Sequence, residues 1–190
     1  MTRIMADSIT AADIVPNPDL VAGYVNGNYA WTTADWQMFG QAGQVRINVT
    51  GGLNLGNCLD IETGDATPGH AAAWFDARHA AGTTNLAIYC SRDTLPAVRA
   101  AMGARHYYVW LATLDGTRGP FPGIAAVQWA GQAQTHGHYD LSEVYDDTWH
   151  PAPGPAPTPV PAGARSLAAK IASDAQTLSH YAQQLHGLLA

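Results

Sequence analysis

Residues 57–103 read NCLDIETGDATPGHAAAWFDARHAAGTTNLAIYCSRDTLPAVRAAMG, and this stretch alternates short apolar runs with helix-like segments. The runs at 57–63 and 85–91 are bounded by turn-forming residues and predict β-strands. The segments at 71–81 and 92–102 start shortly after Thr-Pro or Ser and are followed by glycine, which predicts helices. Strands that alternate with helices favour parallel pairing through right-handed crossovers.

The same alternation continues on both sides of this stretch. Further strand-like runs lie at 20–27, 45–51, 106–114, 125–130 and 139–145. The connections between the later runs are shorter, which predicts a barrel that is irregular on one side. We therefore expect an α/β fold over residues 1–150, an irregular (β/α) TIM-like barrel, with an open doubly wound sheet as the alternative.

The composition limits the classes of partner. Of the 190 residues, 47% are apolar and 13% are charged, a balance that supports a buried core. With a formal net charge of -6 and a pI near 5.6, the chain lacks the basic surface of nucleic-acid-binding proteins. Residues 1–13 hold no apolar signal-peptide core, and no apolar run reaches the length of a membrane span. We expect no nucleic-acid or membrane partner and a cytoplasmic location at synthesis, with incorporation into a virion as a further expectation.

The character of the chain changes after residue 150. Residues 151–163 begin PAPGPAPTPVP, which predicts a semi-rigid polyproline linker. Residues 164–190 predict a helix, because apolar side chains recur at alternating spacings of four and three, the heptad pattern of a coiled coil. Its seam consists of Ile171, Ala175, Leu178, Ala182, Leu185 and Leu189. We expect the helix to mediate a homo-oligomer or a larger assembly, and packing back on the barrel is the alternative.

The two cysteines, Cys58 and Cys90, are too few and too far apart for a disulfide-dense scaffold or a zinc site. Both lie in predicted strands, so we expect buried thiols. A disulfide between them is the alternative in an oxidising compartment.

The sharpest chemical feature is CLDIE at residues 58–62. In a strand, side chains alternate, so Asp60 and Glu62 point to one face at the carboxyl end, where barrel active sites lie. Two neighbouring carboxyl groups raise each other's pKa and supply an acid beside a carboxylate, as glycoside hydrolysis requires. The alternative is structural, an ion pair between Asp60 and Arg46.

Aromatic side chains stand near the ends of other predicted strands, where they could stack on sugar rings or fill the core. These residues are Tyr24, Tyr89, Trp110, Trp129 and Tyr139. Gln128 and Asp140, on the late strands, are candidates for hydrogen bonds to sugar hydroxyls. We therefore expect a glycan-binding cleft that contains both kinds of side chain.

His136 and His138 flank a glycine just before Asp140. A metal site would need a third ligand, and the sequence offers none at a suitable spacing. We expect no metal site and no cofactor.

A set of motifs resembles the glycoside hydrolase family 25 lysozymes and, more closely, the glycoside-hydrolase-like domains of actinobacteria and their phages. In chain order the motifs are AGYVNGNYAW, CLDIETGDATP, AIYCSRDTLPAV, YYVWLA, AVQWAG and YDLSEVYDDTW. The likeness covers about residues 13–150, and it rests on the order and spacing of the motifs together.

The resemblance implies an irregular (β/α) barrel, cell-wall peptidoglycan as the substrate class and no metal cofactor. By position, Glu62 matches the family's general acid, Asp60 its partner carboxylate and Asp140 an acidic residue on the final strand. The family carries an aspartate on its first strand. In the first strand expected for this chain, Asn26 stands at that position. An amide there could orient water or a sugar hydroxyl but could not ionise, which puts activity in question.

Two functions follow as expectations. The first is a phage-associated glycosidase that cuts cell-wall polysaccharide through Glu62 and Asp60. The second is an inactive barrel that decorates a particle or binds the host surface and assembles through its C-terminal helix.

The heptad generates the first prediction. Leu178→Asp places a charge in the apolar seam, so it should lower the sedimentation coefficient of a self-associating chain towards the monomer value. If the unaltered chain is already monomeric and Leu178→Asp destabilises the barrel domain, the helix packs on its own domain and the oligomer interpretation is wrong.

Overall fold

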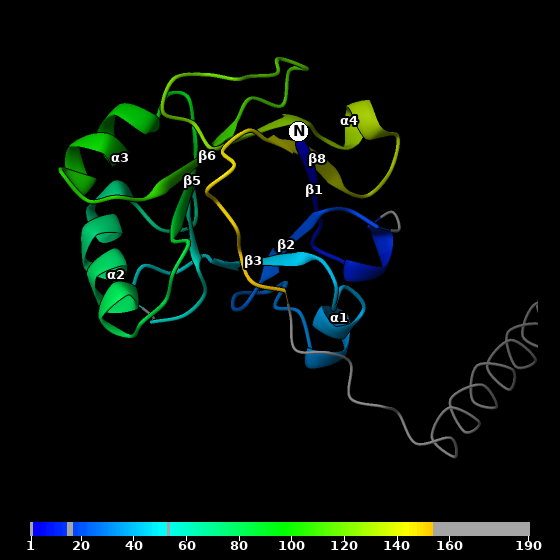
Figure 1. Ribbon diagram of the computed structural model, residues 1–190, viewed down its shortest axis with the longest axis horizontal. Coiled ribbons are helices and arrows are strands. Elements are labelled where there is room, and N and C mark those ends of the chain that lie inside the picture. The colour runs from blue at the N-terminus through cyan, green and yellow to red at the C-terminus, as the bar shows by residue number, and fades with distance from the viewer. Residues whose placement is uncertain (1, 15–16, 53, 154–190) are drawn as a thin grey trace, which may run out of the picture. The chain divides into compact units, whose positions relative to one another are not determined.

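The computed structural model describes residues 2–14, 17–52 and 54–153 (Figure 1). Eight strands form a closed barrel in which neighbours in sequence are neighbours in space. The strands are β1 (Arg3–Asp7), β2 (Leu20–Tyr24), β3 (Gly43–Asn48), β4 (Cys58–Ile61), β5 (Ala87–Ser91), β6 (Tyr108–Ala112), β7 (Ala126–Ala130) and β8 (Asp140–Val144). The expected TIM-like barrel is thus confirmed, and the open doubly wound alternative is wrong.

The barrel is irregular at its closure. Strands β1 to β7 pair in parallel, whereas β8 is antiparallel to both β7 and β1. The start of β8 therefore lies at the end of the barrel where the other seven strands finish. This reversal brings Asp140, the first residue of β8, opposite Asp7, the last residue of β1.

Strand β1 is absent from the sequence-based prediction, which begins its strands at residue 20. The segment RIMAD is only five residues long and carries charges at both ends, so it shows little alternation. Met5 and Ala6 are nevertheless completely buried, and the strand hydrogen-bonds to β2 on one side and β8 on the other. Tertiary pairing, not local pattern, makes this segment a strand.

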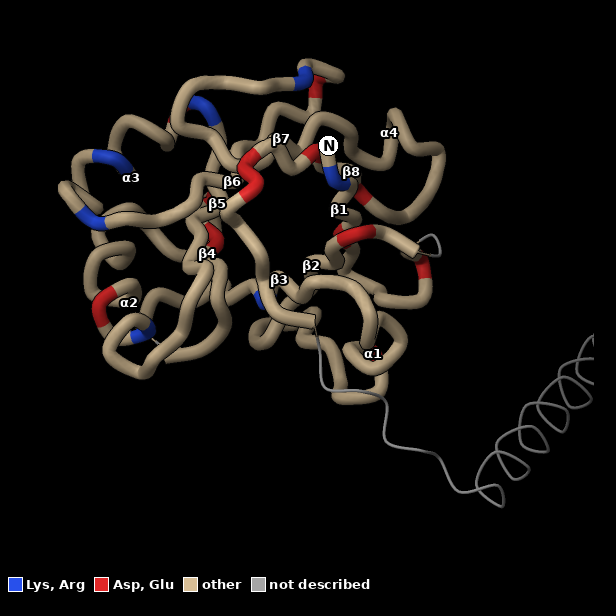
Figure 2. Tube along the Cα trace, in the orientation of Figure 1, with Lys and Arg blue, Asp and Glu red and all other residues tan. Residues whose placement is uncertain are grey.

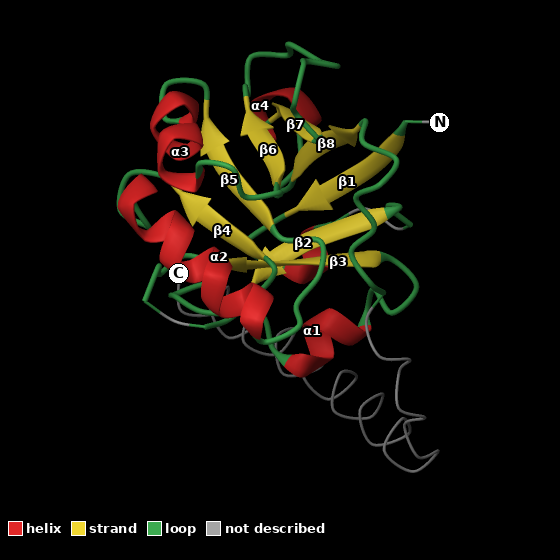
Figure 3. Ribbon diagram, turned by 60° about the vertical axis from the view of Figure 1, so that its left-hand side comes forward, coloured by secondary structure: helices red, strands yellow, loops and turns green. Residues whose placement is uncertain are grey.

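The helices lie outside the barrel wall and cover it unevenly. The α-helices are α1 (Thr33–Gln37), α2 (Pro68–Ala80), α3 (Leu95–Met102) and α4 (Gln132–Thr135), with a 3-10 helix η1 (Ala11–Asp13). Helices α2 and α3 lie beside β4 and β5 (Figure 3). Gly82 and Gly103 adopt positive φ angles of 77° and 58° after α2 and α3, as expected of glycine at helix ends.

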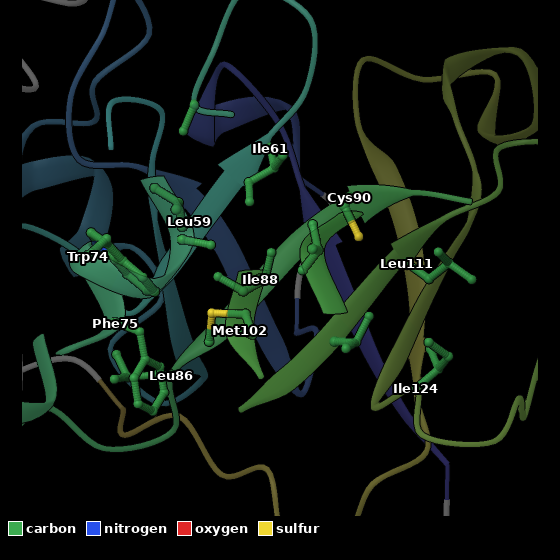
Figure 4. Close-up of a cluster of buried hydrophobic side chains, with 14 of the residues drawn as sticks. Leu59, Ile61, Trp74, Phe75, Leu86, Ile88, Cys90, Met102, Leu111 and Ile124 are labelled. Atoms are coloured by element: carbon green, nitrogen blue, oxygen red, sulfur yellow. The ribbon is translucent and has the colours of Figure 1, made fainter. Parts of the chain in front are cut away.

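Alternation along the strands gives two apolar layers. Inward side chains such as those of Leu20, Val45 and Trp110 fill the barrel. Outward ones, such as Leu59 and Ile88, pack under α2 and α3 (Figure 4). This alternation separates the cysteines. Cys58 points inward and Cys90 outward, and both are free and buried thiols.

The barrel unit continues a little beyond residue 150. The Trp149 ring is fully buried, and its Nε1 donates to the Asn85 carbonyl at 3.2 Å. The backbone N–H of Gln44 donates to the Ala152 carbonyl at 3.0 Å, so the first residues of the proline-rich stretch contact β3. The remainder of the expected linker and the expected helix at 164–190 lie outside the described residues. Within the described part of the chain, no helix has the length and apolar character needed to cross a membrane.

The second prediction concerns Trp149. This large side chain is buried at the end of the barrel where the seven parallel strands begin. Trp149→Ala should lower the free energy of unfolding by about 3–5 kcal/mol, because it removes buried apolar surface and leaves a cavity. Chemical denaturation would measure the change. Met38→Ala, at a side chain that is 57% exposed, should stay within about 0.5 kcal/mol of the original protein. Equal effects of the two substitutions would contradict a structural role for Trp149.

Candidate active site

A polar pocket of about 160 Å³ opens where the seven parallel strands end. Its lining residues are Asp7, Tyr24, Ile47, Asp60, Glu62, Tyr89, Trp110, Leu114, Gln128 and Asp140. They come from strands β1 to β8 and the segments that follow them, so the barrel itself assembles the site. This is the position at which barrel enzymes place their active sites.

Asp60 and Glu62 both line this pocket, as the alternation in CLDIE predicts. Asp60 is buried near the end of β4, and Glu62 follows the strand and is exposed at the mouth. Arg46 lies elsewhere. Its guanidinium stacks on the Trp36 ring at 4.7 Å and donates to Gln44 Oε1 at 2.8 Å. The alternative of an Asp60–Arg46 ion pair is therefore wrong.

Asp7 is the site residue that sequence analysis missed. It ends β1, is buried, and both of its carboxylate oxygens accept from Gln128 Nε2, at 3.0 and 2.9 Å. A signal was present in the sequence, because Asp7 directly follows the short apolar run from Ile4 to Ala6. The first strand of this barrel thus ends in an aspartate.

Asn26 does not line the pocket, contrary to the sequence-based prediction. Its side-chain amide donates to Asn48 Oδ1 and Thr50 Oγ1, both at 2.8 Å, and accepts from the Val49 N–H at 3.0 Å. These bonds join the segments that follow β2 and β3. Asn26 follows β2, which is the second strand of the barrel, whereas the sequence-based prediction placed it in the first.

Gln128 and Tyr89 form a hydrogen-bonded chain behind Asp7. The Tyr89 hydroxyl donates to Gln128 Oε1 at 2.6 Å, which orients the amide so that its Nε2 faces Asp7. The same Nε2 lies 3.4 Å from Asp140 Oδ2. Gln128 therefore connects the carboxyl groups of the first and last strands.

The predicted aromatic residues divide between the two sides of the wall. Tyr24 is half-buried at the pocket, and Trp110 is buried beneath it, with Nε1 donating to Ser142 Oγ at 2.9 Å. Trp129 points outward, where the Arg118 guanidinium lies 3.7 Å from its ring centre. Tyr139 also packs on an outer cluster. The proposed sugar-binding role of Trp129 is thus inconsistent with its position, because neighbours of the inward Gln128 on β7 must point outward.

Burial and mutual repulsion change the acidity of the carboxyl groups. Burial and the charge of Asp140 raise the pKa of Asp7 to about 8. Burial and the charge of Glu62 raise the pKa of Asp60 to about 8. The pKa values of Glu62 and Asp140 are also raised, in both cases chiefly by burial.

The pocket contains no compensating positive group, since no lysine, arginine or histidine is among its lining residues. Acidic positions, red in Figure 2, occur beside β4 and β8. Asp60 Oδ1 is buried without a hydrogen-bond partner. A buried, unpartnered carboxyl oxygen is costly, which favours protonation of Asp60 or a hydrogen bond to its Oδ1 from a bound group.

The histidine pair lies in the loop before β8. His136 caps α4 with a left-handed backbone, and the His138 carbonyl accepts from Ser8 Oγ at 2.7 Å. Among the described residues, no group of three or more His, Cys, Asp or Glu side chains is placed to hold a metal ion.

Neither comparison by sequence finds a relative for this chain: no family model matches it, and no curated protein matches it.

The third prediction follows from the raised pKa of Asp60. The folded protein binds this proton more tightly than the unfolded chain, so ionisation costs stability as the pH rises from 3.8 towards about 8. Asp60→Asn removes that cost. Its gain in free energy of unfolding should grow across this window and exceed about 1 kcal/mol at pH 8, the equivalent of one pKa unit.

Denaturation at a series of pH values would measure this gain. Asp115→Asn provides the control, because hydrogen bonds from Thr117 lower the pKa of Asp115 and its dependence has the opposite sign. A loss of stability in Asp60→Asn that is constant from pH 4 to pH 8 would refute the assignment.

Proposed function

We propose that this barrel is a glycoside hydrolase that acts on bacterial cell-wall glycan. The observation that carries the proposal is the gathering of Asp7, Asp60, Glu62 and Asp140 around one pocket at the carboxyl ends of the strands. Glycosidases use paired carboxyl groups, one to protonate the leaving oxygen and one to stabilise or attack the sugar. The arrangement also supports the resemblance to family 25 lysozymes. The resemblance implies an aspartate on the first strand, and Asp7 supplies it where the sequence had offered only Asn26.

We assign Glu62 as the general acid. It is the most exposed of the four carboxyl groups, so it can reach a glycosidic oxygen at the mouth. Partial burial of its carboxyl group still raises its pKa. A raised pKa keeps the acid protonated closer to neutral pH, where it can donate.

Asp60 is assigned as the partner carboxyl group beneath Glu62. Burial and the charge of Glu62 raise its pKa to about 8, which favours the protonated form at neutral pH. A sugar that carries developing positive charge would favour the ionised form, because an opposite charge nearby lowers a carboxyl pKa. Asp60 would then stabilise the oxocarbenium-like transition state electrostatically.

Asp7 and Asp140 are assigned to positioning and to binding of sugar hydroxyls. Gln128 holds Asp7 in one orientation through two hydrogen bonds, so its carboxyl group is pre-organised. Tyr24 offers a half-exposed aromatic face at the pocket for stacking on a sugar ring. All of the roles assigned here belong to side chains of the barrel. Association with a phage particle through the heptad at 171–189 stays a prediction.

The fourth prediction tests the general acid. Glu62→Gln should reduce turnover on peptidoglycan by at least about 100-fold, the usual contribution of general acid catalysis. The free energy of unfolding should stay within about 1 kcal/mol or rise, because catalytic acids are often destabilising. A zymogram and a turbidity assay on purified cell walls would measure activity.

Glu143→Gln is the matched control, since Glu143 is the other glutamate of the chain and pairs with Arg118 outside the pocket. It should retain the original activity. If the unaltered protein is inactive, hydrolysis is refuted. A glycan pulldown that persists in Glu62→Gln and falls in Tyr24→Ala would instead identify a binding module.

A further inference from the structure

The outer face of β3 lacks a covering helix. Val45 and Ile47 point into the barrel, so Gln44 and Arg46, which alternate with them, point outward. The connections before β3 and after β4 hold α1 and α2, whereas the described residues between β3 and β4 form no helix. A pocket of about 460 Å³ lies on this part of the outer wall.

Two arginines line this outer pocket, Arg46 of β3 and Arg78 of α2, and no acidic residue is among its lining residues. Both arginine side chains are half-buried. Within the described part of the chain, the arginines that form ion pairs are others, namely Arg92, Arg105 and Arg118. Two half-buried positive charges therefore share one pocket without a carboxylate partner from the described residues.

Neutral groups hold both guanidinium groups in place. Arg78 Nε donates to the Gly56 carbonyl at 2.7 Å, and Nη1 donates to the Asn54 carbonyl at 3.0 Å and to Asn54 Oδ1 at 3.1 Å. Arg46 stacks on Trp36 and donates to Gln44 through Nη2. A guanidinium has five N–H donors, so Nη2 of Arg78 and Nε and Nη1 of Arg46 are not used by these bonds. The two groups are thus oriented while their charge stays uncompensated.

Gly56 brings the supports of the two arginines together. It has a φ angle of 71°, and a Cβ atom built on it would lie 2.3 Å from the Arg46 carbonyl oxygen. Glycine permits both the left-handed backbone and this close approach. The segment whose carbonyls hold Arg78 therefore lies directly against the backbone of Arg46.

Charge and lining together indicate the class of ligand. Burial lowers the pKa of the Arg46 guanidinium, as expected of a cation that has lost water without gaining an anion. Guanidinium groups bind carboxylates through short, charge-assisted hydrogen bonds. Val25 and Leu55 also line the pocket, and Leu55 is 40% exposed, so an aliphatic surface adjoins the cations. The volume falls in the range of about 300–1,000 Å³ that is usual for pockets that bind organic ligands.

We propose that this outer pocket binds the free carboxyl group of a peptide with small apolar side chains. Arg46 and Arg78 would bind the carboxylate, and Val25 and Leu55 would contact the aliphatic part. The site is separate from the proposed hydrolysis, because the outer pocket shares no lining residue with the pocket at the carboxyl ends of the strands.

The test, our fifth prediction, is an NMR titration of the full chain with N-acetyl-alanyl-alanine and with its C-terminal amide, which lacks the negative charge. The free acid should bind at least about tenfold more tightly, the usual effect of a charge-assisted hydrogen bond. Arg46→Gln and Arg78→Gln should each reduce that preference. Arg99→Gln is the matched control and should keep it, because Arg99 is exposed, lies outside the pocket and has no ion pair among the described residues.

A second pair of variants leaves both arginines and their hydrogen bonds in place. Leu55→Glu supplies a carboxylate from the chain itself, which should compete with the peptide and weaken binding of the free acid at least about tenfold. Its Tm should be unchanged or higher, because the new charge compensates the two cations. Leu55→Gln has nearly the same size without the charge, and it should retain the preference for the free acid.

Each remaining outcome overturns the proposal. If the unaltered chain binds acid and amide equally, or binds neither, the pocket is not a carboxylate site. If the preference persists in Arg46→Gln and Arg78→Gln with Tm unchanged, the carboxylate binds elsewhere. Tighter binding of inorganic phosphate than of the free acid would overturn the assignment to a peptide. The activity of the barrel is tested separately through Glu62→Gln.

Discussion

Closure of the barrel between β1 and β8 is the constraint on which the rest of the structure depends. Because β8 runs antiparallel to both neighbours, its first residue lies where the other strands end, and Asp140 pairs in register with Asp7. A parallel eighth strand would place its first residue at the opposite end of the barrel. The antiparallel ladder therefore completes the wall and brings two acidic residues, separated by almost the whole domain in sequence, to one pocket.

The side-chain amide of Gln128 connects the carboxyl groups that barrel closure brings together. Gln128 is buried on β7, accepts from Tyr89 and donates to Asp7. The hydrogen bonds hold this buried amide in one orientation, because reversing it would place its oxygen against a carboxyl group. The tyrosine hydroxyl fixes the direction of the amide, and the amide fixes the carboxyl group. Pre-organisation of this kind would serve the proposed hydrolysis, because the groups would not have to reorient when substrate binds.

The elements whose pattern is local can be predicted from the sequence. The alternation in CLDIE placed Asp60 and Glu62 correctly, and seven strands were predicted near their observed positions. Strand β1 could not be predicted in this way, because a five-residue strand with charged ends has no distinctive period. That omission shifted the count of strands by one, so the sequence interpretation placed Asn26 in the first strand, whereas the first strand of the barrel ends in Asp7. It also placed both Gln128 and Trp129 in the cleft, although adjacent side chains of a strand point to opposite faces.

The two ends of the barrel interior have opposite effects on stability. At the pocket, buried carboxyl groups repel each other, Asp60 Oδ1 lacks a partner and Leu114 has a left-handed backbone. Each of these features costs free energy that a well-packed apolar end would not. At the other end, Trp149 is completely buried in the apolar cluster inside the barrel. Packing there offsets the cost at the pocket, and this division lets one small barrel hold four acidic groups together without losing its fold.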